Sequence, residues 1–267
     1  MPAIPTRLDV LAGLAAALAG AALGPAACAS TAPAIAAASD LQFALPELAE
    51  AFRAQGGGAL KLVFGSSGAF TTQIEQGAPF ELFLSADQAY VRRLAGQGLT
   101  RDDGVRYAQG RIALFAPQGS ALKVDGQLQD LRAALADGRL RRFAIANPEH
   151  APYGRAARQV LIHAGLWDAV APRLVLGENA AQAAQFASRG AAQGGLIPHA
   201  LALAPALAAR GTSALVPAAW HQPLNQQMVL LKNAGPTAGA FYAWLQSPAA
   251  KAILTRSGFS TAPAEAR

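Results

Sequence analysis

Short apolar runs alternate with helix-like stretches along this sequence from Ala34 onward, and no other feature constrains the fold as strongly. The runs include "AIAAA" and "RIALFAP", and the stretches between the runs are about ten residues long, often closed by glycine. Strands that alternate with helices of this length are typical of domains with largely parallel sheets. The sequence therefore predicts an α/β fold with mostly parallel sheets flanked by helices.

The composition is that of a folded, globular chain. Hydrophobic residues make up 52% of the 267 residues and charged residues only 14%, whereas disordered chains have few apolar and many charged residues. The net charge is +6, but the sequence lacks the basic stripe that nucleic-acid-binding domains usually show. We therefore expect one or two domains with an ample core and no nucleic-acid partner.

Residues 1–29 are predicted to be a secretory signal peptide. Arg7 precedes the apolar run "LAGLAAALAGAALG", which is too short and too rich in Ala and Gly for a membrane span, and "ACAS" offers cleavage after Ala29. In the alternative, Cys28 is the lipid-bearing first residue of a lipoprotein, but Pro25 stands where such signals usually carry Leu. Cys28 is the only cysteine, so the mature chain can form no internal disulfide. We expect a periplasmic protein.

Polar junctions follow several of the predicted strands. Ligands of open α/β sheets bind beyond the carboxyl ends of the strands, and these junctions offer hydroxyls, small residues and helix starts with few Lys or Arg. Such a composition suits an anion site made of backbone N–H groups, with Gly65 and Gly68 expected to let the backbone approach closely. Simple helix capping is the alternative for each junction alone. The junctions are "AAASDL", "VFGSSGAF", "FLSAD", "IANPEHAPYGR", "LVLGENAAQ" and "GLIPHA".

Five blocks of the sequence, spanning residues 34–259, resemble the periplasmic molybdate-binding proteins of bacterial ABC importers. The resemblance implies a two-lobed periplasmic-binding-protein fold of type 2 that closes on a tetrahedral oxyanion. It assigns residues 30–110 and 226–267 to the first lobe and residues 111–225 to the second. The blocks are "AAASDLQFALPELAEAF", "FGSSGAFTTQIEQGAPFELFLSAD", "NPEHAPYGRAARQVLIHAGLWD", "GENAAQAAQFASRG" and "AFYAWLQSPAAKAILTRSGF".

The same resemblance implies five ligand-binding residues. Ser39, Asp40 and Ser67 would come from the first lobe. Tyr153 and the backbone N–H of Ala180 would come from the second. Since a carboxylate would repel a dianion, we expect the backbone N–H of Asp40 to face the anion and its side chain to turn away or cap the helix. No side chain is expected to coordinate the metal, although tungstate-binding relatives that use carboxylates leave this open for Asp40.

Two positions depart from the family pattern. Pro198 stands where some relatives place a tyrosine hydroxyl on the anion, and Tyr153 matches a branch with Tyr in the "PEH" loop instead. The first junction is one residue longer than in the other branch. Whether Ser39 or Asp40 fills the main position there stays open.

The donor-rich junctions suit molybdate for a chemical reason. Molybdate is fully deprotonated at neutral pH and only accepts hydrogen bonds, whereas phosphate keeps a proton that needs an acceptor. Sulfate, which is also a dianion, must be excluded because it is smaller than molybdate. Tungstate is so similar to molybdate in size that the sequence cannot distinguish the two. We expect no cofactor and no enzyme activity, and as partners only the oxyanion and the permease subunits of an ABC importer at the inner membrane. The protein is expected to act as a monomer.

Three other functions are alternatives. The same fold could bind sulfate or phosphate, or serve as the effector domain of a transcription factor, which the signal peptide argues against. A serine hydrolase with its nucleophile in "GSSG" is the third, although the spacing differs from the G-x-S-x-G elbow. Near this turn, we expect His150 and Glu149 to shape their loop or pair with each other, and Arg155 to be solvated.

Overall fold

The computed structural model of the chain describes residues 32–260. The predicted signal peptide and Cys28 lie outside these residues. None of the helices between residues 32 and 260 is both long enough and apolar enough to cross a membrane.

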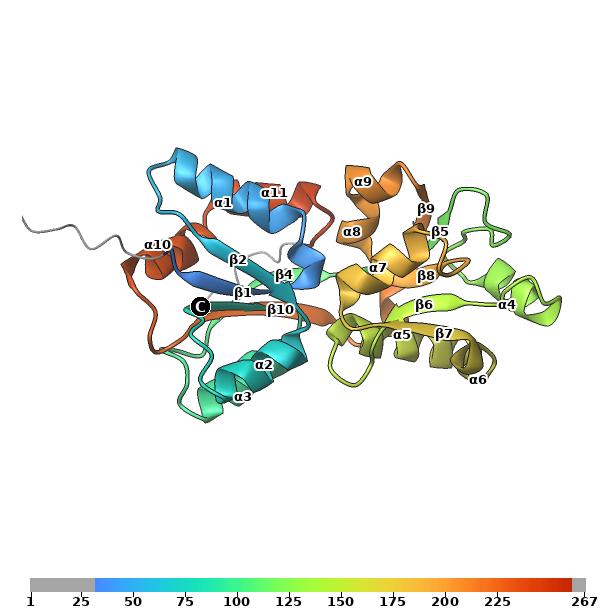
Figure 1. Cartoon of the computed structure of the whole chain (residues 1–267), viewed down its shortest axis with the longest axis horizontal. Coiled ribbons are helices and arrows are strands. Elements are labelled where there is room, and N and C mark those ends of the chain that lie inside the picture. Colours follow the sequence, from blue (N-terminus) through green and yellow to red (C-terminus); the bar gives the residue numbers. More distant parts are fainter. Residues whose placement is uncertain (1–31, 261–267) are drawn as a thin grey trace, which may run out of the picture. The chain divides into compact units, whose positions relative to one another are not determined.

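The described residues form two five-stranded sheets, and each sheet with its helices is called a lobe below (Figure 1). The first sheet has the order β2-β1-β3-β10-β4, in which β1 pairs in parallel with β2 and β3 while β10 is antiparallel to both of its neighbours. Its strands are β1 (Ala34–Ala38), β2 (Lys61–Gly65), β3 (Leu82–Ser85), β4 (Val105–Gly110) and β10 (Leu224–Leu230).

The second sheet repeats this arrangement in the order β7-β6-β8-β5-β9. Here β6 pairs in parallel with β7 and β8, and β5 is the antiparallel strand. One reversed strand per sheet leaves both sheets mostly parallel, as predicted. The strands are β5 (Ile112–Pro117), β6 (Phe143–Ala146), β7 (Leu174–Gly177), β8 (Gly195–Pro198) and β9 (Gly211–Leu215).

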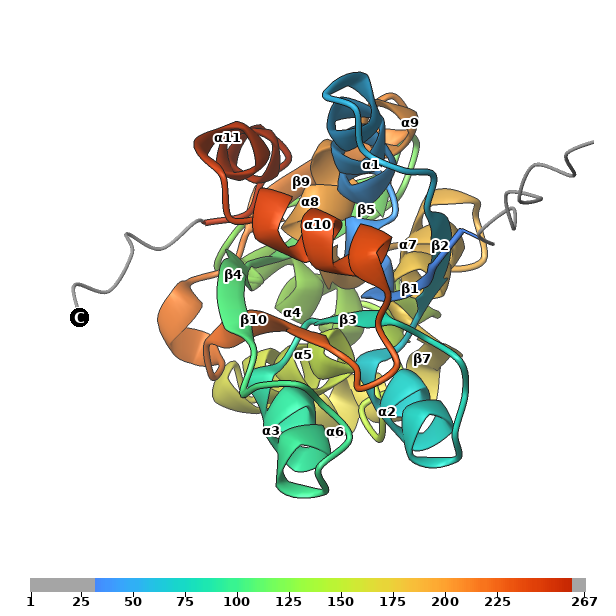
Figure 2. The same ribbon diagram turned by 90° about the vertical axis from the view of Figure 1, so that its left-hand side faces the viewer.

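Helices cover both faces of the first sheet (Figure 2). The helices α1 (Ala44–Ala54), α10 (Pro236–Trp244) and α11 (Pro248–Arg256) bury their apolar sides on one face, and α2 (Ser67–Glu75) and α3 (Gln88–Gly96) on the other. Pro46 lies in the first turn of α1, where its missing N–H breaks no hydrogen bond. The short 3-10 turn η1 (Ser39–Leu41) links β1 to α1.

The second sheet is likewise covered on both faces. On one face lie α4 (Gln129–Ala136), α5 (Pro152–His163) and the short α6 (Trp167–Val170). The other face carries α7 (Ala180–Ser188), α8 (His199–Leu203) and α9 (Pro205–Ala208). The 3-10 turns of this part of the chain are η2 (Ala171–Arg173) and η3 (Ala218–Trp220).

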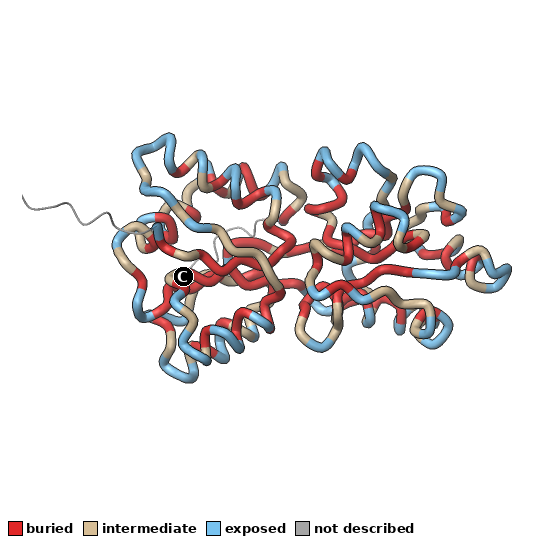
Figure 3. The backbone as a smooth tube through the Cα atoms, in the orientation of Figure 1, coloured by how far each residue is buried: buried red, intermediate tan, exposed pale blue. Residues whose placement is uncertain are grey.

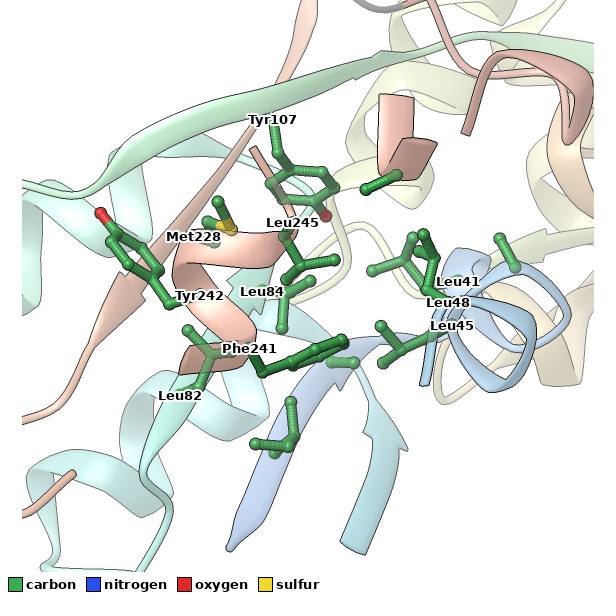
Figure 4. Close-up of a cluster of buried hydrophobic side chains, with 14 of the residues drawn as sticks. Leu41, Leu45, Leu48, Leu82, Leu84, Tyr107, Met228, Phe241, Tyr242 and Leu245 are labelled. Atoms are coloured by element: carbon green, nitrogen blue, oxygen red, sulfur yellow. The ribbon is translucent and has the colours of Figure 1, made fainter. Parts of the chain in front are cut away.

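Each lobe has its own apolar core, which follows the strands (Figure 3). In the first lobe, Leu45 and Leu48 of α1 lie on one side of this core, facing Phe241 of α10 and Leu84 of β3 (Figure 4). All four side chains are fully buried, and burying one such side chain contributes about 1.5–3 kcal/mol. These cores fix the strand ends, and with them the junctions that follow the strands.

Candidate functional site

A cavity lies where five of the predicted junctions meet. All five residues predicted to bind the ligand line it, and its volume is about 10 Å³. Its wall contains no Lys or Arg. The lining residues come from both lobes: Ala38, Ser39, Asp40, Gly65, Ser66, Ser67, Ala86, Ala151, Pro152, Tyr153 and Ala180.

Two serine hydroxyls in this wall are fixed by backbone donors. Ser39 Oγ accepts the N–H of Ala181 at 3.2 Å, and Ser67 Oγ accepts the N–H of Ala86 at 3.0 Å. Both side chains are buried, with 3% and 0% of their surface exposed. A serine hydroxyl has a single proton. Since a backbone N–H already uses the oxygen as an acceptor, each proton is left for another group.

The start of α2 supplies a further donor. Ser67 is the first residue of the helix, so no carbonyl of the helix can accept its N–H. The next two N–H groups are used: Gly68 donates to the carbonyl of His150 at 3.0 Å, and Ala69 to Ser66 Oγ at 3.3 Å. The N–H of Ser67 is the one that remains at the cavity, where the positive end of the helix dipole favours an anion.

The start of α7 repeats this pattern from the second lobe. Ala180 is its first residue and lines the cavity. The following N–H groups donate to other atoms: Ala181 to Ser39 Oγ at 3.2 Å, and Gln182 to Asn179 Oδ1 at 3.0 Å. The cavity therefore receives one free helix-start N–H from each lobe, which is the arrangement of an anion clamp.

The side chain of Asp40 does not cap a helix, which was one of the two placements predicted for it. The residue is buried, with 1% of its surface exposed, and its Oδ2 accepts two hydrogen bonds. The donors are the Tyr153 hydroxyl at 2.9 Å and Gln226 Nε2 at 2.5 Å. Its Oδ1 is buried with no hydrogen-bond partner. These donors from α5 and β10 hold the carboxyl group in the cavity wall.

Burial also changes the acidity of this group. It raises the pKa of Asp40 from 3.8 to about 6, against the opposing effect of hydrogen bonds from the Gln226 and Tyr153 side chains and from the backbone of Asp40 and Leu41. Burial and the nearby Asp40 charge raise the pKa of Tyr153 well above its usual value. The Tyr153 hydroxyl therefore keeps its proton at neutral pH, and in this structure it donates that proton to Asp40 rather than into the cavity.

Gln226 and Tyr107 complete this buried network, and the sequence reasoning missed both. The Tyr107 hydroxyl donates to Gln226 Oε1 at 2.6 Å, which turns the amide nitrogen toward Asp40. One signal was available: Gln226 falls between Leu224 and Met228 on the buried phase of β10. A polar residue on the inward side of a strand needs a partner.

Gly65 and Gly68 have packing reasons for lacking a side chain. A Cβ on Gly68 would lie 2.6 Å from the carbonyl oxygen of His150, and one on Gly65 would lie 2.9 Å from the ring of Phe70. Gly68 thus allows the start of α2 to approach the loop of the other lobe.

His150 and Glu149 were expected to shape their loop or to pair with each other, and they do not pair. The N–H of Glu149 donates to Asn147 Oδ1, while His150 Nδ1 lies 2.9 Å from Ser66 Oγ and Nε2 lies 3.5 Å from Glu178 Oε1. The order of serine, histidine and acid is that of a hydrolase triad. However, the side chain of Glu178 is 72% exposed, and Ser66 Oγ serves as the N-cap of α2.

Arg155, which was expected to be solvated, has 37% of its side chain exposed and is also paired. It donates to the Tyr90 hydroxyl at 2.7 Å and to Asp87 Oδ2 at 2.5 Å, and its guanidinium lies 5.2 Å from the centre of the Tyr90 ring. Because α5 and α3 belong to different lobes, this side chain joins the lobes beside the cavity.

Comparison with known proteins agrees with this architecture. The bacterial extracellular solute-binding protein family matches residues 34–260. The molybdate-binding protein ModA of Rhodobacter capsulatus is 33% identical over 218 residues, which cover 80% of this chain and 82% of that protein. ModA of Azotobacter vinelandii is 32% identical over 238 residues, which cover 87% of this chain and 92% of that protein.

Solved structures give the same result. The periplasmic molybdate-binding protein of Azotobacter vinelandii superposes with a TM-score of 0.78 at 32% identity, over 86% of this chain and 100% of that chain. The sulfate-binding protein SubI of Mycobacterium tuberculosis shares the fold, with a TM-score of 0.70 at 15% identity over 88% of each chain. The predicted two-lobed fold is therefore confirmed, and the chain belongs to the bacterial extracellular solute-binding protein family.

Proposed function

We propose that this protein captures molybdate between its two lobes and delivers it to an ABC importer. One observation carries the proposal: the buried hydroxyls of Ser39 and Ser67 are fixed as donors at one cavity by backbone N–H groups. A fully deprotonated oxyanion accepts hydrogen bonds only, so it matches such a wall. The relatives named as molybdate-binding proteins support the same ligand.

The donors come from both lobes. The hydroxyls of Ser39 and Ser67 and the N–H of Ser67 belong to the first lobe, and the N–H of Ala180 to the second. Hydrogen bonds to a charged group contribute about 1.5–3 kcal/mol each, so several together outweigh the cost of ordering the complex. We take residues 30–110 and 226–267 as the first lobe and residues 111–225 as the second. With these boundaries, the two sets of donors would separate when the anion is released.

A second candidate ligand is a protonated oxyanion such as phosphate. The observation in its favour is Asp40 Oδ1, a buried acceptor without a partner in the cavity wall. An ionised Asp40 could accept a hydrogen bond from the proton that phosphate carries. Molybdate carries no proton and could not donate such a bond. Sulfate, which also lacks a proton, would have to be rejected through its smaller size.

Calorimetric titration of the mature protein with molybdate, tungstate, sulfate and phosphate tests the proposal. We expect molybdate and tungstate to bind at least about 100-fold more tightly than the other two anions, a difference of about 2.7 kcal/mol. Binding of phosphate or sulfate without binding of molybdate would overturn it.

The protein is proposed to bind its ligand without turnover. In a hydrolase, Ser66 would be activated by His150 and Glu178, but the N-cap bond to Ala69 and the exposed carboxylate of Glu178 oppose this role. Ester hydrolysis that is lost in Ser66→Ala would favour the enzyme instead. We place the protein in the periplasm as a monomer, with the permease subunits of an importer as its partner.

A further inference from the structure

We propose that Asp40 takes up one proton when the oxyanion binds, so that capture of the ligand is coupled to protonation of a buried carboxyl group. This inference rests on the proposed function, because it requires a dianion in the cavity. Asp40 would then be neither a fixed donor nor a fixed acceptor, since its protonation state would change when the anion binds.

The geometry around the carboxyl group leaves room for a proton. Oδ2 already accepts from Tyr153 and Gln226, whereas Oδ1 is buried and has no hydrogen-bond partner. A protonated carboxyl group has one O–H donor. A proton can therefore bind at Oδ1, where it would turn the carboxyl group from an acceptor into a donor. Asp40 lines the cavity.

Charge supplies the driving force. A dianion beside an ionised Asp40 would place three negative charges together, and no Lys or Arg lines the cavity to offset them. Like charges at close range raise the pKa of a carboxyl group. Burial has already raised the pKa of Asp40 to about 6 without a ligand, so a further rise carries it through neutral pH.

Protonation also frees a donor for the ligand. The step adds one proton from solvent to the carboxylate, which gives a neutral carboxylic acid. A neutral acid accepts more weakly than a carboxylate, so the Tyr153 hydroxyl, now committed to Oδ2, can turn its proton to the anion. The same event removes a negative charge and adds a hydrogen-bond donor.

Few other groups near Asp40 could account for a proton. Tyr153 and Tyr107 keep their protons, since burial raises the pKa of both well above the usual value. His199 begins α8, which packs against η1, and burial lowers its pKa. Charged groups on neighbouring elements include Lys61 of β2, Glu47 of α1 with its partner Arg256, and Arg155 of α5. The titratable His150 contacts Ser66 of the cavity wall. Of all these groups, only Tyr153 lines the cavity.

Calorimetry in buffers of different ionisation enthalpy counts the protons taken up per molybdate bound. At about pH 7.5 we expect wild type to take up between about half a proton and one proton, and its affinity to fall correspondingly by about 3- to 10-fold per pH unit around that pH. Asp40→Asn should take up none and bind with an affinity independent of pH. Glu50→Gln removes an exposed carboxyl group of α1 and should behave as wild type.

The outcomes separate this inference from the proposed function. Molybdate binding by wild type without proton uptake would overturn the inference and leave the function standing. Uptake that persists in Asp40→Asn would also overturn it, because another group would carry the proton. Absence of molybdate binding by wild type at every pH would overturn both. The wild-type measurement needs no variant, so it decides even if Asp40→Asn folds poorly.

Discussion

At the scale of single residues, two adjacent serines have different roles. Ser67 Oγ accepts a hydrogen bond from the backbone N–H of Ala86, which directly follows β3. The proton of the Ser67 hydroxyl is therefore left for a group in the cavity. Ser66 Oγ caps α2 through Ala69 and contacts His150 of the other lobe. Both line the cavity, but only Ser67 has a donor that no protein group uses.

Ser67→Ala should therefore weaken molybdate binding more than Ser66→Ala. We expect the loss of one charged hydrogen bond, about 1.5–3 kcal/mol or roughly 10- to 150-fold in Kd. Ser66→Ala should instead lower the free energy of unfolding by about 1 kcal/mol through the lost cap. Calorimetry and urea unfolding of both variants measure these effects. Equal losses of affinity would contradict the different roles.

Asp40 makes the stability of the ligand-free protein depend on pH. Its folded pKa of about 6 lies above the ordinary value of 3.8, so the folded state holds this proton more tightly than the unfolded state. The resulting stabilisation is complete below about pH 4 and is lost as the pH rises through about 6, by about 3 kcal/mol at most.

Asp40→Asn should remove this dependence. Urea unfolding at about pH 4 and at about pH 7.5 should show the variant gaining stability relative to wild type as the pH rises, because the amide cannot ionise. Comparison with wild type cancels the contributions of the other carboxyl groups, such as Glu75, whose pKa is lowered by Arg93. A stability difference that does not change with pH would contradict the burial of an ionisable Asp40.

At the scale of elements, α3 and α5 are joined across the lobes by Arg155. Its contacts with Asp87 and Tyr90 combine an ion pair with a cation–π contact. Each is worth about 0.5–1 kcal/mol at partly exposed positions. Since these contacts exist only while the two helices lie side by side, they favour the arrangement that encloses the cavity.

Arg155→Ala should accordingly speed the release of molybdate. We expect the dissociation rate to rise about 3- to 10-fold, measured by stopped-flow tryptophan fluorescence with excess tungstate as competitor. Arg93→Ala is the matched control, because its bidentate pair with Glu75 joins α3 to α2 within the first lobe. A similar rise in both variants would assign the effect to surface charge rather than to contact between lobes.

At the scale of the whole molecule, the sequence predicted what local patterns determine. Strand–helix alternation gave the α/β class, and the ends of β1, β2, β6 and β7 meet at the cavity as the topology of parallel strands requires. The return of β10 to the first sheet could not be derived from periodicity, since strand partners far apart in sequence leave no local signal. The family resemblance supplied it.

The network around Asp40 was beyond prediction for the same reason. Gln226 and Tyr153 are 186 and 113 residues away from Asp40 along the chain. Their meeting depends on how the lobes and sheets place β10 and α5. Local reasoning about charge therefore predicted that the carboxyl group turns away from the anion or caps the helix, and it did not foresee the buried donors that bind it.

The position of the ligand tests the central claim most directly. Crystals grown with molybdate should show one anomalous peak from molybdenum in the cavity. We predict oxygens at hydrogen-bonding distance, about 2.7–3.2 Å, from the hydroxyls of Ser39 and Ser67 and the N–H of Ala180. A peak elsewhere, or an empty cavity at saturating molybdate, would contradict the account.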